Sequence, residues 1–232
     1  MRREVVCMLL MLMAASVGFG ERAARAQGIS NKQYALIQYT FTLHPDIRNK
    51  IRPFEGLFPT PPSQYASLDP VYFRLKGLCF ESLRQRLERE CNMYILPLFT
   101  YGRRFTYDNE GYPSMPIERA QRRGSAKYYM SIDIAIQTSP ESSMAVSGEK
   151  YRDSILSPRE YLRPKVVVGV TIYPRLGIIP RAQYRTAVQW MTPIRMEPTM
   201  LDGIVNSKPR YDRTSLLEAI NLGISAVIEE IK

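Results

Sequence analysis

The chain has 232 residues, and its 32 lysines and arginines outnumber its 22 aspartates and glutamates, which gives a net charge of +10. Its hydrophobic fraction of 45% is typical of a globular chain and excludes an intrinsically disordered one. The positive charge suits contact with anionic lipid, lipopolysaccharide or cell-wall polymer, although many envelope proteins are basic without such a contact.

The first 26 residues have the three parts of a secretory signal peptide. A basic start at Arg2 and Arg3 is followed by an apolar run over residues 5–19 and by the small-residue site Ala24-Arg25-Ala26. We therefore expect cleavage after residue 26 and export of residues 27–232 as a single domain. A retained membrane anchor is the alternative, but the apolar run is shorter than the roughly 20 residues that span a bilayer.

The domain opens with a strand, a loop and a long helix. Residues 34–43 alternate with a period of two, which predicts a strand. The prolines of residues 44–66 indicate a long loop that forms neither a helix nor a central strand. Asp69 and Pro70 suit the N-cap and first position of a helix that runs to residue 91.

Four further segments read as strands because they combine alternation with β-branched residues. Pro97 places the first of them at a sheet edge or a bulge, and the small polar residues of 138–157 indicate a long loop after the second. The four segments are residues 93–99, 127–137, 165–173 and 183–191.

Two more helices complete the prediction. A short one is expected at 116–123, with Ser114 as its cap and Gly124 as its stop. The last begins near Ser215, which has capping-box spacing to Glu218. The elements together predict an α+β domain, with a single mixed β-sheet of about five strands packed with two long helices and one short helix.

Residues that would carry catalysis or bind a metal are scarce. The single histidine, His44, accompanies no G-x-S-x-G, H-E-x-x-H or C-x-x-C motif, so we predict no catalytic residue, no metal site and no cofactor. Beyond the signal peptide, Cys79 and Cys91 fall twelve residues apart in one predicted helix. That spacing is about 18 Å of helical rise, too far for a disulfide.

Paired carboxylates are the remaining catalytic option, since glycoside hydrolysis requires no histidine. The candidates are Asp133, Asp153 and Glu118. Asp133 alternates with the apolar Ile132 and Ile134, so it is expected on the opposite face of the sheet, where a solvated or ion-paired aspartate is the default.

Aromatic and basic residues interleave in the segment that follows the predicted strand 93–99. Such mixtures are enriched in interface hot spots and also suit stacking on sugars; the alternative is a twisted hairpin with cross-strand aromatic pairs. Arg119, Arg122 and Arg123 lie close in the sequence and would either extend the same surface or only solvate the predicted short helix. The candidate binding residues are Tyr101, Arg103, Arg104, Phe105, Tyr107 and Tyr112.

The element order resembles that of the periplasmic α/β domains of the CsgG and LpoB type and of the N-terminal domain of TolB. The resemblance is carried by the strand 34–43, the helix 69–91, the step IERAQRRGSAKYYMSIDI (Ile117–Ile134), the hairpin 165–191 and the helix 215–231. It implies a non-enzymatic envelope protein that acts by docking to a partner, and it carries over no residue roles.

We therefore expect an exported, non-enzymatic binding or assembly module that acts by protein–protein docking and is periplasmic, associated with the outer membrane or released. Its expected partner is an envelope protein; an anionic glycan or lipid surface is a further candidate, and export argues against nucleic acid. The alternatives are a carboxylate-dependent hydrolase of glycans and a structural subunit of a larger envelope complex, in which the loops 44–66 and 192–213 order against neighbours.

Overall fold

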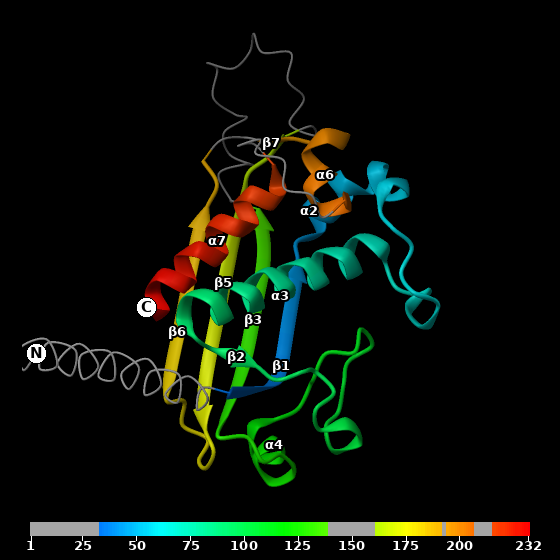
Figure 1. The fold of residues 1–232 in the computed structure, drawn as a ribbon. Helices are drawn as coiled ribbons and strands as arrows, with labels where there is room; N and C mark the ends of the chain where they lie inside the picture. The colour runs from blue at the N-terminus through cyan, green and yellow to red at the C-terminus, as the bar shows by residue number, and fades with distance from the viewer. Residues whose placement is uncertain (1–32, 139–160, 192–193, 207–214) are drawn as a thin grey trace, which may run out of the picture.

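The computed structural model describes residues 33–138, 161–191, 194–206 and 215–232 (Figure 1). The predicted signal peptide, nearly all of the predicted loop 138–157 and Asp153 lie outside the described residues. Among the described residues, no helix combines the length and the apolarity that crossing a membrane requires.

The predicted mixed sheet is confirmed, with five strands in the order β2-β1-β3-β5-β6. Both β2 and β3 run parallel to β1, whereas β5 is antiparallel to β3 and β6 is antiparallel to β5. A separate two-stranded ribbon pairs β4 with β7. The strands are β1 (Gln33–Leu43), β2 (Tyr94–Ile95), β3 (Tyr128–Thr138), β4 (Tyr161–Leu162), β5 (Pro164–Pro174), β6 (Ala182–Gln189) and β7 (Ile194–Arg195).

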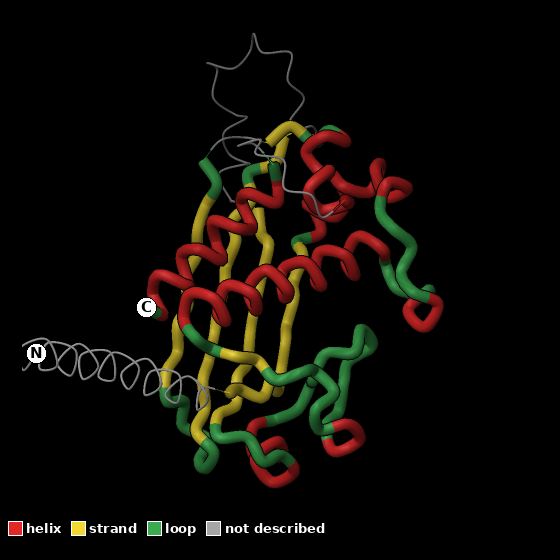
Figure 2. Tube along the Cα trace, in the orientation of Figure 1, coloured by secondary structure: helices red, strands yellow, loops and turns green. Residues whose placement is uncertain are grey.

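Two long helices, α3 (Pro70–Cys91) and α7 (Leu216–Ile231), cover one face of the sheet (Figures 1 and 2). Both begin where their caps predict. The Asp69 carboxylate accepts hydrogen bonds from the amides of Val71 and Tyr72, and the Ser215 hydroxyl accepts one from the Glu218 amide. Their apolar stripes pack on the alternating isoleucines and valines of β3 and β5 to form the main core. Cys79 and Cys91 both lie on α3 as free thiols.

A smaller second layer covers one end of the opposite face. It is built mainly from residues 96–107 and 115–126, which include the short helix α4 (Ile117–Arg123), whereas the residues between them contact α3 on the other face. A bulge at Ile37 makes room for it, because the pairing of β1 with β3 shifts there and the Ile37 carbonyl accepts a hydrogen bond from the Met115 amide. The second core contains Ala35, Ile37, Phe105, Met115, Ala120, Ala126 and Tyr129.

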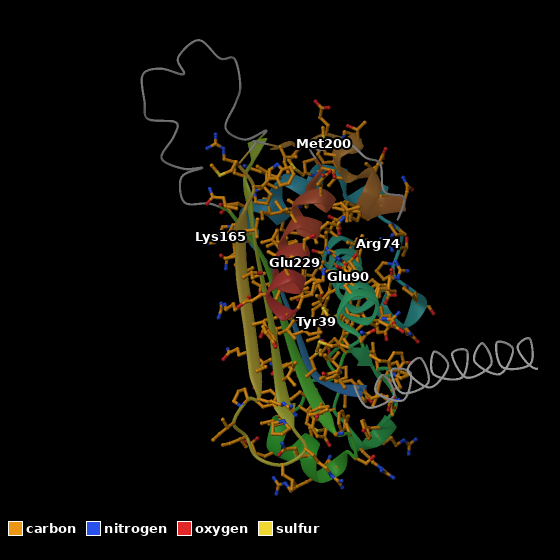
Figure 3. All side chains as sticks on the ribbon, turned by 60° about the vertical axis from the view of Figure 1, so that its left-hand side comes forward. Tyr39, Arg74, Glu90, Lys165, Met200 and Glu229 are labelled. Carbon is orange, nitrogen blue, oxygen red and sulfur yellow. The ribbon has the colours of Figure 1, made fainter. Side chains whose placement is uncertain are left out.

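The rest of that face is not covered by any described helix. Lys165 lies on this side of the sheet, away from α7, whereas Tyr39 lies between the sheet and α3 (Figure 3). Asp133 is exposed on this face while its neighbours Ile132 and Ile134 are buried, as their alternation predicts.

The prediction that residues 44–66 form no helix was wrong. The helix α2 (Pro45–Ile51) begins there, followed by 3-10 turns at Arg52–Leu57 and Ser63–Tyr65. Proline is compatible with the first turn of a helix, because the amide hydrogen that it lacks would have no partner there. The His44 side chain caps this turn by accepting a hydrogen bond from the Asp46 amide.

Three smaller expectations also change. The strand expected at 93–99 is only the two-residue β2, and the loop expected over residues 192–213 contains a helix, α6 (Pro198–Asn206). Pro116 rather than Ser114 occupies the cap of α4. Gly124 does end α4, with extended backbone, and a Cβ there would lie 2.9 Å from the Tyr129 hydroxyl.

Candidate functional site

Three segments that are far apart in the sequence meet at one end of the sheet, the lower end in Figure 1. They are the turn at residues 96–104, the helix α4 with its exit at residues 117–127, and the connection between β5 and β6 at residues 174–181. Because β1 and β3 start here and β5 ends here, the sheet topology itself brings the segments together. We call this region the basic end.

Side-chain hydrogen bonds to carbonyls connect the three segments. The guanidinium of Arg123 donates to the carbonyl of Arg104 over 3.3 Å. The Nε2 atom of Gln121 donates to the carbonyls of Pro174 and Gly177 over 2.9 and 2.8 Å. The helix α4 therefore bridges the two loops and holds them in one arrangement.

The basic end is rich in cations that have no carboxylate partner in the part of the chain that the structure describes. Its three segments contain one acidic residue, Glu118, and none of their cations forms an ion pair with another described residue. On the helix-covered side, by contrast, Arg48, Lys76, Arg84 and Arg86 are all paired. The eight cations are Arg103, Arg104, Arg119, Arg122, Arg123, Lys127, Arg175 and Arg181.

A cleft of about 770 Å³ opens in the basic end. Phe99, whose side chain is 63% exposed, stands in its wall, and the exposed Arg104 and Lys127 bring positive charge to it. The cleft therefore offers an aromatic surface beside two cations. Its lining residues are Gln33, Leu96, Phe99, Thr100, Tyr101, Gly102, Arg104, Ser125, Ala126 and Lys127.

The structure divides the predicted binding residues among three places. Tyr101 and Arg104 line the cleft, and Arg103 is exposed in the same turn. Phe105 is buried in the second core, where its ring stacks on Tyr101 with centroids 4.6 Å apart.

Tyr107 is half-buried and supports the wall of the cleft from behind. Its ring lies 5.1 Å from that of Phe99, and its hydroxyl donates a hydrogen bond to the Leu98 carbonyl. Burial raises the pKa of this hydroxyl. Aromatic pairing of the kind expected from a hairpin is therefore present here, and it fixes the position of Phe99.

Tyr112 belongs to a polar cluster beneath α3 instead of the cleft. Its ring packs on Tyr39, at 4.9 Å, and the ammonium of Lys76 lies 5.1 Å from its centre. That ammonium also contacts Asp108 at 2.6 Å and Glu110 at 2.9 Å. Burial alone would lower the pKa of Lys76, but its hydrogen bonds to the two carboxylates outweigh burial and raise it.

Sequence reasoning missed part of this region. Phe99, Lys127 and three exposed aliphatic side chains in the connection after β5 were not among the predicted residues. The available signal was the composition of residues 175–181, Arg-Leu-Gly-Ile-Ile-Pro-Arg, because a hairpin turn normally carries polar residues.

A second hollow, of about 320 Å³, lies on the uncovered face of the sheet. One row of paired residues crosses the sheet here: Thr40 on β1, Asp133 on β3, Gly169 on β5 and Arg185 on β6. Asp133 is the one carboxylate among the described residues that line it. The other candidate, Glu118, lies on α4 at the basic end. No group of three metal-ligating residues occurs among the described residues.

Comparisons with known proteins do not assign a family. No family model and no curated protein matches the chain. One solved structure that matches is the hypothetical protein CT253 from Chlamydia trachomatis, with 10% identity over 87% of this chain and 93% of that chain. The TM-score of 0.33 is too low for this likeness to bear on fold or function.

Proposed function

We propose that the protein is a non-enzymatic docking module of the bacterial envelope and that its cleft binds an acidic segment of a partner protein. The observation that carries the proposal is the set of eight cations at the basic end that have no carboxylate partner among the described residues, together with a cleft that has an exposed phenylalanine. Export is supported by the signal-like N-terminal sequence, and docking as the mode of action by the resemblance to periplasmic domains.

The chemistry of the cleft selects the partner. Arginine and aromatic residues are the side chains that dominate binding free energy at protein interfaces. Covering Arg104 and Lys127 with a neutral surface would desolvate two cations without compensation, which is unfavourable. An acidic segment avoids that penalty, and charge attraction also accelerates its association.

The cleft is held ready for binding by contacts that do not involve a partner. The stacking of Tyr101 on Phe105 and of Phe99 near Tyr107 fixes the aromatic wall, while Arg123 holds the carbonyl of Arg104. A partner would therefore lose little affinity to ordering this loop.

The glycan-hydrolase alternative receives less support from the described residues. It requires two carboxyl groups on either side of a substrate, about 5–10 Å apart. The lining of the cleft contains no carboxylate and that of the sheet-face hollow contains Asp133 alone.

The test is co-purification of the tagged full-length protein from gently solubilised envelopes after mild crosslinking. We expect a stoichiometric partner with an acidic segment that is lost when Phe99→Ala and Arg104→Ala are combined, with affinity reduced at least tenfold, as for interface hot spots. The matched control combines Arg185→Ala on the uncovered sheet face with Leu222→Ala on α7, which are also exposed.

Two outcomes would contradict the proposal. One is a partner that the Phe99 and Arg104 variant retains but the control variant loses, which would move docking to the sheet face or α7. The other is recovery of the processed protein alone in the soluble fraction, which would redirect the work to screening glycan substrates.

A further inference from the structure

The connection between β5 and β6 presents three exposed aliphatic side chains within four residues. Leu176 is 80% exposed, Ile178 56% and Ile179 78%. A single exposed aliphatic residue is ordinary on a protein surface, whereas several gathered at one protruding turn mark a site of contact. Transfer of these side chains out of water would be favourable. We call residues 175–181 the apolar tip.

The apolar tip is held in shape without using its aliphatic side chains. Gly177 takes a left-handed conformation, with φ of +91°. Gln121 donates hydrogen bonds to the carbonyls of Pro174 and Gly177, and the amide of Arg181 donates to the carbonyl of Ile172. The aliphatic side chains are therefore displayed by a fixed turn.

Arginines stand on both sides of the aliphatic centre. Arg175 is exposed. The guanidinium of Arg181 donates to the Tyr128 hydroxyl over 2.9 Å and lies 5.3 Å from the centre of that ring. Neither arginine has a carboxylate partner among the described residues. The tip thus combines an apolar centre with a cationic rim.

We propose that the apolar tip inserts into the interfacial region of an anionic phospholipid bilayer. Aliphatic side chains at the boundary of the acyl chains, with arginines at the level of the headgroups, are the arrangement that such a surface binds. The tip protrudes at the lower end of the molecule (Figure 1), so a fluid surface fits it without a matching pocket.

This inference goes beyond docking through the cleft and does not rest on it. Both surfaces belong to the basic end, so insertion of the tip would hold the cleft beside the membrane, facing partners located there. The residues that carry the two activities differ, because Phe99 and Arg104 line the cleft whereas Leu176, Ile178 and Ile179 form the tip.

A tryptophan placed at the tip reports insertion directly. The chain has one tryptophan, Trp190, so the wild type supplies the background. The full-length Ile179→Trp variant is mixed with vesicles of equimolar phosphatidylcholine and phosphatidylglycerol, with or without brominated acyl chains. Ala187→Trp, at an exposed position on the uncovered sheet face, is the matched control. The full-length chain contains the apolar residues 5–19 in every variant, so any lipid contact through them is the same in all and cancels in the comparison.

We expect blue-shifted emission and quenching by brominated chains for Ile179→Trp, whereas Ala187→Trp should show no blue shift and no quenching beyond that of the Trp190 background. Adding Arg175→Gln to Ile179→Trp should raise the lipid concentration at half-maximal quenching about fivefold, since each arginine near an anionic surface contributes roughly that factor to membrane affinity. Adding Arg185→Gln should leave that concentration unchanged. The Phe99 and Arg104 variant that loses its partner should keep the quenching, which separates the two proposals.

Three results would overturn insertion. They are no quenching of Ile179→Trp above the Trp190 background, equal quenching of Ala187→Trp, and quenching that appears only when a partner protein is added. The last result would reassign the tip to a protein contact.

Discussion

At the scale of single residues, the buried ammonium of Lys76 is the most consequential charge in the described structure. Its side chain is 5% exposed, and those of its partners Asp108 and Glu110 are 23% and 14% exposed. Both carboxylates belong to the segment at residues 106–114, so their ion pairs with Lys76 attach this segment to α3. The rings of Tyr39 and Tyr112 lie beside the ammonium and exclude water from it.

We expect Lys76→Met to lower the free energy of unfolding by about 3–5 kcal/mol, because it leaves two carboxylates in a buried site without a cation. Urea denaturation with an unchanged slope would measure the loss. Arg84→Met is the matched control; its pair with Glu81 is more exposed, at 32% and 46%, so its loss should stay below about 1 kcal/mol.

A rescue experiment distinguishes charge from shape. Adding Asp108→Asn and Glu110→Gln to Lys76→Met should restore most of the stability, since the side-chain amide introduced at position 108 would keep the Oδ1 acceptor that the backbone amides of Glu110 and Tyr112 use. A rescue variant no more stable than Lys76→Met would refute the electrostatic explanation.

The contribution of Lys76 to stability also depends on pH. Because the pKa of Lys76 is raised in the folded state, its contribution is complete below the ordinary lysine pKa of about 10.4 and is lost as pH rises through the higher value.

At the scale of elements, the close approach of α7 to β5 depends on a glycine. A Cβ at Gly223 would lie 2.5 Å from Cγ1 and 2.8 Å from Cβ of Val166. Alanine stabilises an isolated helix relative to glycine by about 1 kcal/mol, so propensity and packing oppose each other here. Packing should dominate because Val166 lies in a strand paired on both sides.

We therefore expect Gly223→Ala to destabilise the protein by about 1–2 kcal/mol, the overpacking penalty less the gain in propensity. Gly77→Ala on α3 is the control, since the nearest atom to its Cβ would be the Tyr112 hydroxyl at 3.7 Å, and it should gain up to about 1 kcal/mol. In a Val166→Ala background the penalty of Gly223→Ala should disappear. Thermal or urea unfolding would measure these effects in Gly223→Ala, Gly77→Ala, Val166→Ala and the double variant of Val166 and Gly223. A stabilising Gly223→Ala would show that α7 moves freely on the sheet.

Elements with strong local signals were predictable from the sequence. The alternation of β3 placed Ile132 and Ile134 inward and Asp133 outward, and Asp69 with Pro70 located the start of α3. The helix α2 was missed because proline content was taken to exclude a helix, although Pro45 falls where proline is accepted.

The candidate site was predictable only in part, because its composition does not distinguish a surface from a packed hairpin. Tyr101 and Arg104 reach the cleft, whereas Phe105 and Tyr112 enter cores on opposite faces of the sheet. That division depends on contacts with residues distant in the sequence: the bulge at Ile37 turns an additional apolar side chain toward the second layer, where Phe105 also packs. No local pattern in residues 101–112 encodes it.

At the scale of the whole molecule, the two faces of the sheet carry cores of very different size. The main core joins α3 and α7 to β1, β3 and β5, whereas the second core holds a few side chains around Phe105, which is 4% exposed. The basic end, with both proposed contact surfaces, is built on this smaller core. Its positions therefore depend on a layer with less buried apolar surface to stabilise it.

We expect this second layer to open locally at lower free energy than the centre of the sheet. The amides of Ser114 and Met115, which donate to Thr106 and Ile37, should exchange hydrogen faster than those of β3 from Ile132 to Ile136. Phe105→Ala should accelerate exchange of the first group about 100-fold or more, the effect of an emptied aromatic site, and leave β3 nearly unchanged. Leu83→Ala, in the main core, should accelerate exchange of the β3 amides and leave the first group nearly unchanged, because the first group exchanges through an opening that does not break the main core. Equal protection of both groups in the wild type, measured by hydrogen exchange, would mean that the molecule unfolds as one cooperative unit and that the basic end is as rigid as the sheet beneath it.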